Sequence, residues 1–113
     1  TNIIAQEMAL VATKVPKSFI SDQKRIWQSR RDLIYRRLQE IGLNLHKPEG
    51  AFYAFPKIAD PEKVCLDLWT KHKIITYPGT WFGAEGNLRL SYALDCDKID
   101  KGVEIIGKYI NGE

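Results

Sequence analysis

The spacing of hydrophobic residues along this chain changes from a helical period to a strand period and back. From about Phe19 to Ile41 they recur at helical spacing, and Gly42 follows as a C-terminal stop. The apolar stripe consists of Ile26, Leu33, Ile34, Leu38 and Ile41. An earlier helical stretch, residues 2–14, stops before Pro16. It opens abruptly without an initiator methionine, so we expect the chain to be part of a longer protein.

Short strand-like segments separated by turns follow the long helix. "AFYAF" comes after a turn at Pro48 and Gly50, where we expect the glycine to supply an unusual backbone angle. "KIITY" is a short apolar strand that ends at Pro78. Between the two strands, Asp60 is the predicted cap of a helix that has a proline at its first position. The expected buried side of that helix consists of Val64, Cys65, Leu68 and Trp69.

The segment "NLRLSYA" alternates between apolar and polar residues, as a half-buried strand does. We expect Leu88, Leu90 and Tyr92 to face the core. Arg89 then projects from the opposite face, between two neutral polar residues. A guanidinium at such a position has two interpretations: it closes an ion pair with a local acid such as Glu85, or it binds an anionic ligand.

A final amphipathic helix completes the pattern, with Asp95 or Asp97 as its expected cap. Its stripe consists of Ile99, Val103, Ile106 and Ile110. The predicted order is helix, helix, strand, helix, strand, strand, helix. Because few residues separate the last two strands, we expect an α+β fold with a small, largely antiparallel sheet packed against helices. The glycines of "PGTWFGAEG" precede no predicted helix, which excludes a dinucleotide or phosphate loop.

Composition limits the class of protein. A chain of 113 residues with 44% hydrophobic and 27% charged residues fits one compact domain, so we expect residues 1–113 to form a single domain. No apolar run approaches the roughly 20 residues that span a bilayer, and no signal peptide is recognisable, so we expect a soluble, cytoplasmic protein. The two cysteines lie far apart without ligand spacing, so no metal site is predicted.

The formal net charge of +3 is mild, and much of the positive charge lies in "QKRIWQSRRDLIYRRLQE". Asp32 precedes Arg36 by four residues, and Arg36 precedes Glu40 by four. This is the spacing of ion pairs along one solvated helix face, so we favour a salt-bridged surface helix over a nucleic-acid-binding patch.

Four short motifs follow one another over nearly the whole chain. They are Arg30-Arg31-Asp32, Pro48-Glu49-Gly50-Ala51-Phe52-Tyr53, Pro78-Gly79-Thr80-Trp81-Phe82-Gly83 and Arg89-Leu90-Ser91-Tyr92-Ala93. With these four motifs in this order, the chain resembles the C-terminal small domain of one enzyme family. The family is the fold-type I, pyridoxal-phosphate-dependent aminotransferases of classes I and II, also called the aspartate aminotransferase superfamily. Each motif alone is weak, but four in order are specific. The resemblance implies that residues 1–42 include the interdomain helical segment.

The resemblance also implies a role for Arg89. The family's matching arginine binds the α-carboxylate of the amino-acid substrate through a bidentate contact, which suits the planar guanidinium. Four aromatic residues lie in the motifs whose family counterparts border the substrate entrance. They are candidates for the cleft wall, although core packing is the more common role of such side chains: Phe52, Tyr53, Trp81 and Phe82.

The cofactor site is expected outside this chain. In the family, the lysine that binds pyridoxal phosphate lies in the large domain, upstream of where this chain begins. Lys14, Lys17 and Lys24 do not lie in that context, so none is assigned, and no catalytic or cofactor-binding residue is predicted here. The expected parent is a homodimeric transaminase of amino-acid metabolism and biosynthesis, acting between an amino acid and a 2-oxo acid.

Two alternatives from other classes remain open at this point. One is a stand-alone binding module that docks an acidic protein partner through its exposed arginine face. The other is a nucleic-acid binder that uses the basic helix.

Overall fold

The computed structural model describes residues 2–112, and its elements alternate in the predicted order. One short 3-10 helix, η1, adds to the prediction. The elements are α1 (Ile3–Ala12), α2 (Lys17–Glu40), β1 (Tyr53–Ala54), α3 (Pro61–His72), β2 (Tyr77–Pro78), η1 (Gly79–Phe82), β3 (Leu88–Ser91) and α4 (Cys96–Asn111).

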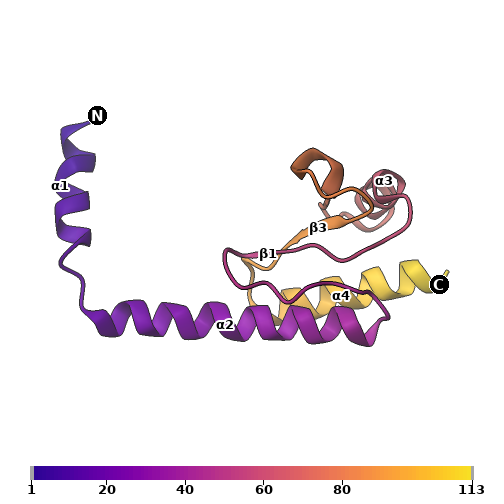
Figure 1. Cartoon of the computed structure of the whole chain (residues 1–113), viewed down its shortest axis with the longest axis horizontal. Helices are drawn as coiled ribbons and strands as arrows, with labels where there is room; N and C mark the ends of the chain where they lie inside the picture. The colour runs from indigo at the N-terminus through magenta and orange to yellow at the C-terminus, as the bar shows by residue number, and fades with distance from the viewer. Residues whose placement is uncertain (1, 113) are drawn as a thin grey trace.

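The three strands form one antiparallel sheet in the order β1-β3-β2. On one side of β3, Ala54 pairs with Leu90, and on the other side Pro78 pairs with Leu88. Helices α2 and α4 run side by side beneath the sheet (Figure 1). The small antiparallel sheet packed against helices confirms the predicted α+β class.

The core lies between one face of the sheet and the helices. Leu38 of α2, Leu68 of α3 and Leu88 of β3 are fully buried. Tyr92, 1% exposed, donates its hydroxyl to the carbonyl of Ala51 at 3.1 Å, so its one polar atom is satisfied inside the core. The remaining buried hydrophobic residues are Ile34, Leu43, Leu45, Ala54, Val64, Leu90, Ile99, Val103 and Ile106.

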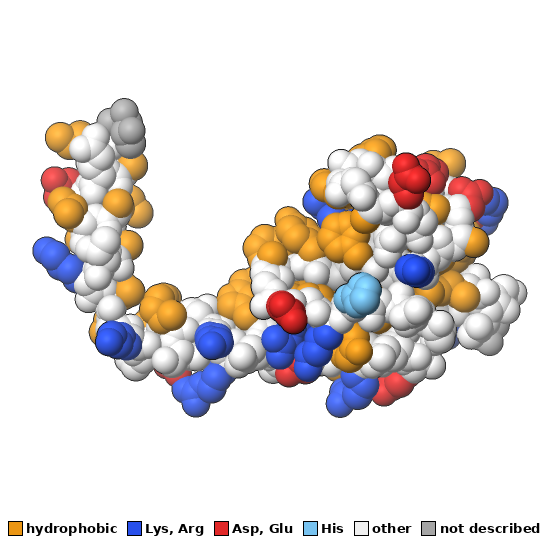
Figure 2. Space-filling view, in the orientation of Figure 1, with side chains coloured by type: hydrophobic (Ala, Val, Ile, Leu, Met, Phe, Trp, Pro, Cys, Tyr) orange, Lys and Arg blue, Asp and Glu red, His pale blue; other side chains and the backbone are white. Residues whose placement is uncertain are grey.

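The N-terminal third of the molecule extends away from this core (Figure 1). No residue of α1 is buried, and apolar side chains are visible along it in Figure 2. Buried residues of α2 begin only at Ile34, and Ile26 is 43% exposed, so the predicted stripe is wrong at its N-terminal end. The residues described contain no helix long and apolar enough to cross a membrane.

The way in which α3 ends shortens the strand predicted at residues 73–77. Lys73 adopts a left-handed conformation (φ 60°) that ends α3, and the N–H of Ile74 donates to the carbonyl of Leu68 at 3.1 Å. The residues that end the helix cannot also pair in the sheet. The predicted strand "KIITY" is therefore reduced to a strand of Tyr77 and Pro78, which ends at Pro78 as predicted.

One side chain of α3 also differs from its prediction, and one of the two caps predicted for α4 is confirmed. Trp69 is 49% exposed, with the ammonium of Lys73 5.7 Å from its ring centre, so it is not on the buried side of α3. Asp95 is the N-cap of α4, as predicted; its carboxylate makes no hydrogen bond to the N–H groups of the helix and accepts one from Arg30 at 3.0 Å. Asp97 lies in the first turn of α4 instead.

The charges of α2 pair partly as predicted. Arg36 reaches Glu40 at 3.6 Å, but Asp32 does not pair with Arg36. The carboxylate of Asp32 contacts Lys47 at 2.8 Å and Arg31 at 2.9 Å. These two cations hold the pKa of Asp32 below its ordinary value, with the hydrogen bond from Lys47 as the larger cause.

Candidate functional site

The sheet presents a second face, turned away from the helices, and Arg89 lies on it. Tyr77 is the direct cross-strand partner of Arg89, and Tyr53 pairs with Ser91, two residues further along β3. Because side chains alternate along a strand, Tyr53, Arg89 and Tyr77 project from the same face. Arg89 therefore emerges opposite Leu88, Leu90 and Tyr92, as the alternation predicted.

Three aromatic rings surround the guanidinium of Arg89. Its Cζ lies 3.8 Å from the ring centre of Phe82, 4.6 Å from that of Tyr53 and 4.8 Å from that of Tyr77. Such contacts stabilise a cation through the negative face of each ring. A guanidinium carries its N–H donors in a planar fork that matches the two oxygens of a carboxylate, and the rings around Arg89 hold the group that carries this fork.

The loop between β2 and β3 brings Phe82 to this face. Gly79 begins η1, and its N–H donates to the carbonyl of Asn87 at 2.7 Å while its carbonyl accepts from Ala84 at 2.9 Å. Gly83 ends η1 in a left-handed conformation. This loop is also joined to α3 by the hydrogen bond that the hydroxyl of Thr80 donates to Glu62 at 2.8 Å, and it places the ring of Phe82 against Arg89.

Arg89 differs from the other arginines in its charge pairing. In residues 2–112 it has no carboxylate within ion-pair distance, Glu85 included. The remaining five arginines all pair with acids: Arg25 with Asp22, Arg30 with Asp95, Arg31 with Asp32, Arg36 with Glu40, and Arg37 with Glu40 and Asp100. The guanidinium that sits between the aromatic rings is thus the one left without a counter-charge in the described part of the chain.

The four candidate cleft-wall residues fall into two groups. Tyr53 and Phe82 contact Arg89. Phe52 lies instead against Trp27, with ring centres 5.7 Å apart, and Trp81 is 69% exposed. Their role as walls of a cleft stays a prediction.

Tyr77 is the residue of this face that motif reasoning missed. The motif begins one residue later, at Pro78, and so gave no reason to single it out. The register of β2 against β3 places residue 77 opposite residue 89, and the loop of residues 79–87 between the two strands gives no sequence signal for that register.

The turn before β1 is built differently from the prediction. The left-handed residue is Ala51, with φ 56°, and not Gly50. Gly79 does not have a left-handed angle; what requires a glycine there is space, because a Cβ would lie 2.2 Å from the carbonyl oxygen of Ala84.

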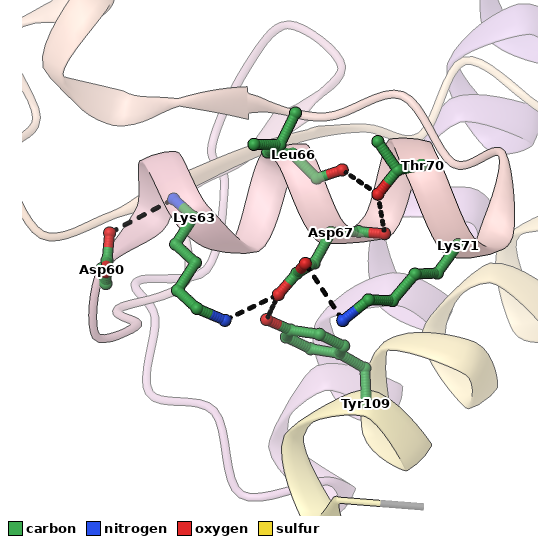
Figure 3. A network of polar contacts seen from close by, with 7 residues as sticks. All are labelled: Asp60, Lys63, Leu66, Asp67, Thr70, Lys71 and Tyr109. Carbon is green, nitrogen blue, oxygen red and sulfur yellow. Dashed lines mark hydrogen bonds and ion pairs between the residues drawn. The ribbon is translucent and has the colours of Figure 1, made fainter.

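A second polar cluster joins α3 to α4 (Figure 3). The carboxylate of Asp67 accepts from Lys63 at 2.7 Å and from the hydroxyl of Tyr109 at 2.7 Å, and it contacts Lys71 at 3.1 Å. These donors hold the pKa of Asp67 well below its ordinary value, the hydrogen bond from Lys63 being the largest cause. Every polar atom of the cluster has a partner, so we interpret it as a structural brace between two helices.

The residues present do not fit a pyridoxal phosphate site. The amine that bonds this cofactor must lose its proton, which proteins promote by burial or by neighbouring cations. Every lysine of the chain is exposed, including Lys14, Lys17 and Lys24. Within residues 2–112 there is also no cluster of three or more His, Cys, Asp or Glu side chains that could hold a metal ion.

These observations define an α+β domain whose sheet carries, on the face turned away from the helices, an arginine without an acidic partner in residues 2–112. The family model for aminotransferases of class I and II matches residues 2–106, and the chain belongs to that family. The chain is 40% identical in sequence to a probable aspartate/prephenate aminotransferase of Aquifex aeolicus, over 92% of this chain and 29% of that protein. An aromatic-amino-acid aminotransferase of Thermococcus litoralis is 36% identical over 80% of this chain and 25% of its own length.

Solved structures agree with the sequence relatives. The aspartate aminotransferase of Thermotoga maritima superposes with a TM-score of 0.88 at 32% identity, over 97% of this chain and 29% of its own. An aromatic aminotransferase of Pyrococcus horikoshii gives a TM-score of 0.80 at 31% identity, over 88% of this chain and 29% of its own. The chain therefore spans less than a third of the length of these relatives.

Proposed function

We propose that the full-length protein is a pyridoxal-phosphate-dependent transaminase and that Arg89 binds the α-carboxylate of its substrate. In this proposal residues 1–113 are the C-terminal small domain, and residues 1–42 include the segment that connects it to the large domain. Membership of the aminotransferase family supports the activity. The observation that supports the role of Arg89 is its guanidinium, held by three rings and lacking an acidic partner within residues 2–112.

Arg89 binds and orients the substrate in this proposal. Two in-plane N–H groups of a guanidinium donate to the two oxygens of one carboxylate, which fixes both the position and the plane of that group. Both an amino acid and a 2-oxo acid carry this carboxylate, so one contact serves both halves of a transamination. Pyridoxal phosphate, when bound in the full-length enzyme, supplies the electron sink, and no residue of this chain is assigned to that chemistry.

Further properties of the parent rest on the family resemblance. The named relatives act on aspartate, prephenate or aromatic amino acids by their descriptions, and we propose an amino acid and a 2-oxo acid as substrates without choosing among these side chains. We also propose a homodimer in the cytoplasm with a role in amino-acid biosynthesis.

A binding module that uses the basic helix is less well supported. The arginines of α2 pair with acids on α2 itself or at α4, as Arg37 does with Asp100 at 2.5 Å. Arginines engaged in this way have fewer donors left for the phosphates of a nucleic acid.

The proposal is tested by steady-state kinetics of the full-length enzyme with Arg89→Lys and Arg89→Ala. Lysine keeps the charge and loses the two-pronged contact, whereas alanine loses both. A hydrogen bond between charged groups contributes about 1.5–3 kcal/mol, so we expect kcat/KM to fall at least about tenfold for lysine and further for alanine.

Arg36→Ala is the matched control, because Arg36 is exposed on α2 and its pair with Glu40 is long, at 3.6 Å. It should leave kcat/KM within about twofold, since such surface pairs contribute little. Thermal unfolding should remain cooperative for every variant. Full turnover by Arg89→Ala would refute the proposal, and unfolding of that variant would show a structural role instead.

A further inference from the structure

Tyr77 lies beside Arg89, the candidate carboxylate-binding residue, although it belongs to none of the four motifs. It is paired with Arg89 across the β2–β3 ladder, and its ring centre lies 4.8 Å from the guanidinium carbon. On its other side, the ring of Trp81 lies at 5.9 Å. Tyr77 therefore occupies the middle of a row that ends at the guanidinium.

The contact is made by the ring of Tyr77 and not by its hydroxyl. Within residues 2–112 the hydroxyl takes part in no hydrogen bond, and the side chain is 39% exposed. The neighbouring strand residue Pro78 is buried and pairs with Leu88, which fixes the backbone that carries Tyr77. A ring mounted on a fixed backbone can restrict its neighbour.

Such a restriction would lower the conformational entropy that Arg89 loses when it binds an anion. A long side chain that becomes immobilised on binding lowers the affinity by the entropy that it loses. A guanidinium that is already held before the ligand arrives avoids most of that loss. The rings also displace water from around the cation, which strengthens its attraction for an anion.

We propose that Tyr77 is a positioning residue for Arg89: its ring fixes the guanidinium in the plane in which it receives the substrate carboxylate. This inference rests on the proposed function of Arg89. It assigns to Tyr77 a role in ground-state binding through another residue, without contact with the substrate. Phe82 and Tyr53 provide the other two rings, but only Tyr77 lies directly opposite Arg89 in the ladder.

The variants separate the ring from the hydroxyl. Tyr77→Leu removes the aromatic face, and Tyr77→Phe keeps it while removing the hydroxyl. Trp69→Leu is the matched control, because Trp69 is a half-exposed ring on α3 that does not contact Arg89.

Kinetics of the full-length enzyme give the first readout. Loss of preorganisation of one side chain corresponds to a rise of roughly 2- to 10-fold in KM for the amino acid, and kcat should stay within about twofold. Tyr77→Phe should restore KM to within about twofold of the wild-type value. Trp69→Leu should leave both constants unchanged.

The resonance of the Arg89 Nε–H group, followed by NMR on residues 1–113, gives a second readout that does not depend on turnover. Ring currents displace this resonance while the guanidinium lies among the rings. We expect Tyr77→Leu to move it towards its position in an unstructured peptide, and Tyr77→Phe to leave it in place. Circular dichroism on the same samples checks that each variant is folded.

The outcomes distinguish this inference from the function on which it rests. If Arg89→Ala keeps full activity, the proposed function fails and the inference fails with it. If Arg89→Ala is impaired but a folded Tyr77→Leu variant binds substrate normally, only the role of Tyr77 is overturned. An equal loss in Tyr77→Phe and Tyr77→Leu would assign the effect to the hydroxyl and would also overturn the inference.

Discussion

Replacing Gly79 with alanine tests how the loop between β2 and β3 is held. A Cβ at this position would lie 2.2 Å from the carbonyl oxygen of Ala84 and 2.7 Å from that of Asn87. Carbon and oxygen atoms normally approach to about 3.3 Å or more, so the two backbone segments must separate by roughly 1 Å. Both neighbours are backbone atoms, which cannot rotate away as the end of a side chain does.

The cost of Gly79→Ala follows from the bonds that this movement disturbs. Overpacking of this kind destabilises by about 1–3 kcal/mol. The N–H of Gly79 and the carbonyl of Gly79 are both in hydrogen bonds of the same loop, at 2.7 and 2.9 Å. Weakening one of them adds about 1 kcal/mol, which gives a total of roughly 2–4 kcal/mol. For a chain of this size we expect the Tm to fall by roughly 8–16 °C.

Thermal unfolding followed by circular dichroism measures this effect, and Gly102→Ala is the control. Gly102 lies within α4 and a Cβ there would meet nothing within 4 Å. Alanine in a helix interior is favoured by about 0.5–1 kcal/mol, so Gly102→Ala should raise the Tm slightly. A Gly79→Ala variant whose Tm lies within about 2 °C of the wild-type value would refute the steric reasoning.

Three further predictions follow from the charges of the chain. Because the pKa of Asp67 is lowered in the folded state, its contribution to stability is present above its ordinary pKa of 3.8 and is lost as the pH falls below that value. The difference in Tm between the wild type and Asp67→Asn should therefore be large at pH 7 and shrink at pH 3, and an equal difference at both would contradict the ionic brace. Because every lysine is exposed, residues 1–113 alone should form no stoichiometric borohydride-trapped adduct with pyridoxal phosphate at one specific lysine, as read by mass spectrometry. Oligonucleotide binding by the basic helix should be weak and disappear as salt rises, and tight binding at physiological ionic strength would count against the paired arginines.

Helices were easier to predict from the sequence than strands. The stop of α2 at Gly42 is confirmed by its left-handed φ of 85°, and the cap at Asp60 is confirmed by its hydrogen bond to the N–H of Lys63. Both signals are local, since they depend on two or three neighbouring residues. The strand predicted at "KIITY" was mostly wrong, because its apolar composition is equally compatible with a helix end. The hydrogen bond from the N–H of Ile74 to the carbonyl of Leu68 places its first residues at the end of α3.

Burial along the helices depended on what the rest of the fold covers. Ile26 and Ile34 continue one apolar stripe, yet only Ile34 is buried, because α4 reaches only the C-terminal part of α2. Helical periodicity gives the direction in which a side chain points but not the extent of the surface that meets it. The same limit explains why Trp69 was wrongly placed in the core.

The candidate site was predictable in its centre and not in its surroundings. Alternation along β3 was enough to place Arg89 on the face away from the core. The rings came from three separate segments, and only the register between β2 and β3 brings Tyr77 among them. Ion pairs were the least predictable feature, since Asp32 pairs with Lys47, which lies on a loop that no helical spacing includes.

The strict alternation of β3 has a consequence for how this protein tolerates change. Leu88 and Leu90 are buried in the core, so we expect changes there to lower the amount of folded protein, whereas changes at Arg89 should alter ligand binding by the proposed function. A mutational scan that scores abundance and turnover separately should therefore assign adjacent codons to different phenotypes. Natural or directed evolution can then substitute position 89 and its cross-strand neighbour to change ligand binding with little loss of expression. The residues that hold the domain together lie on the other face of the same four-residue strand.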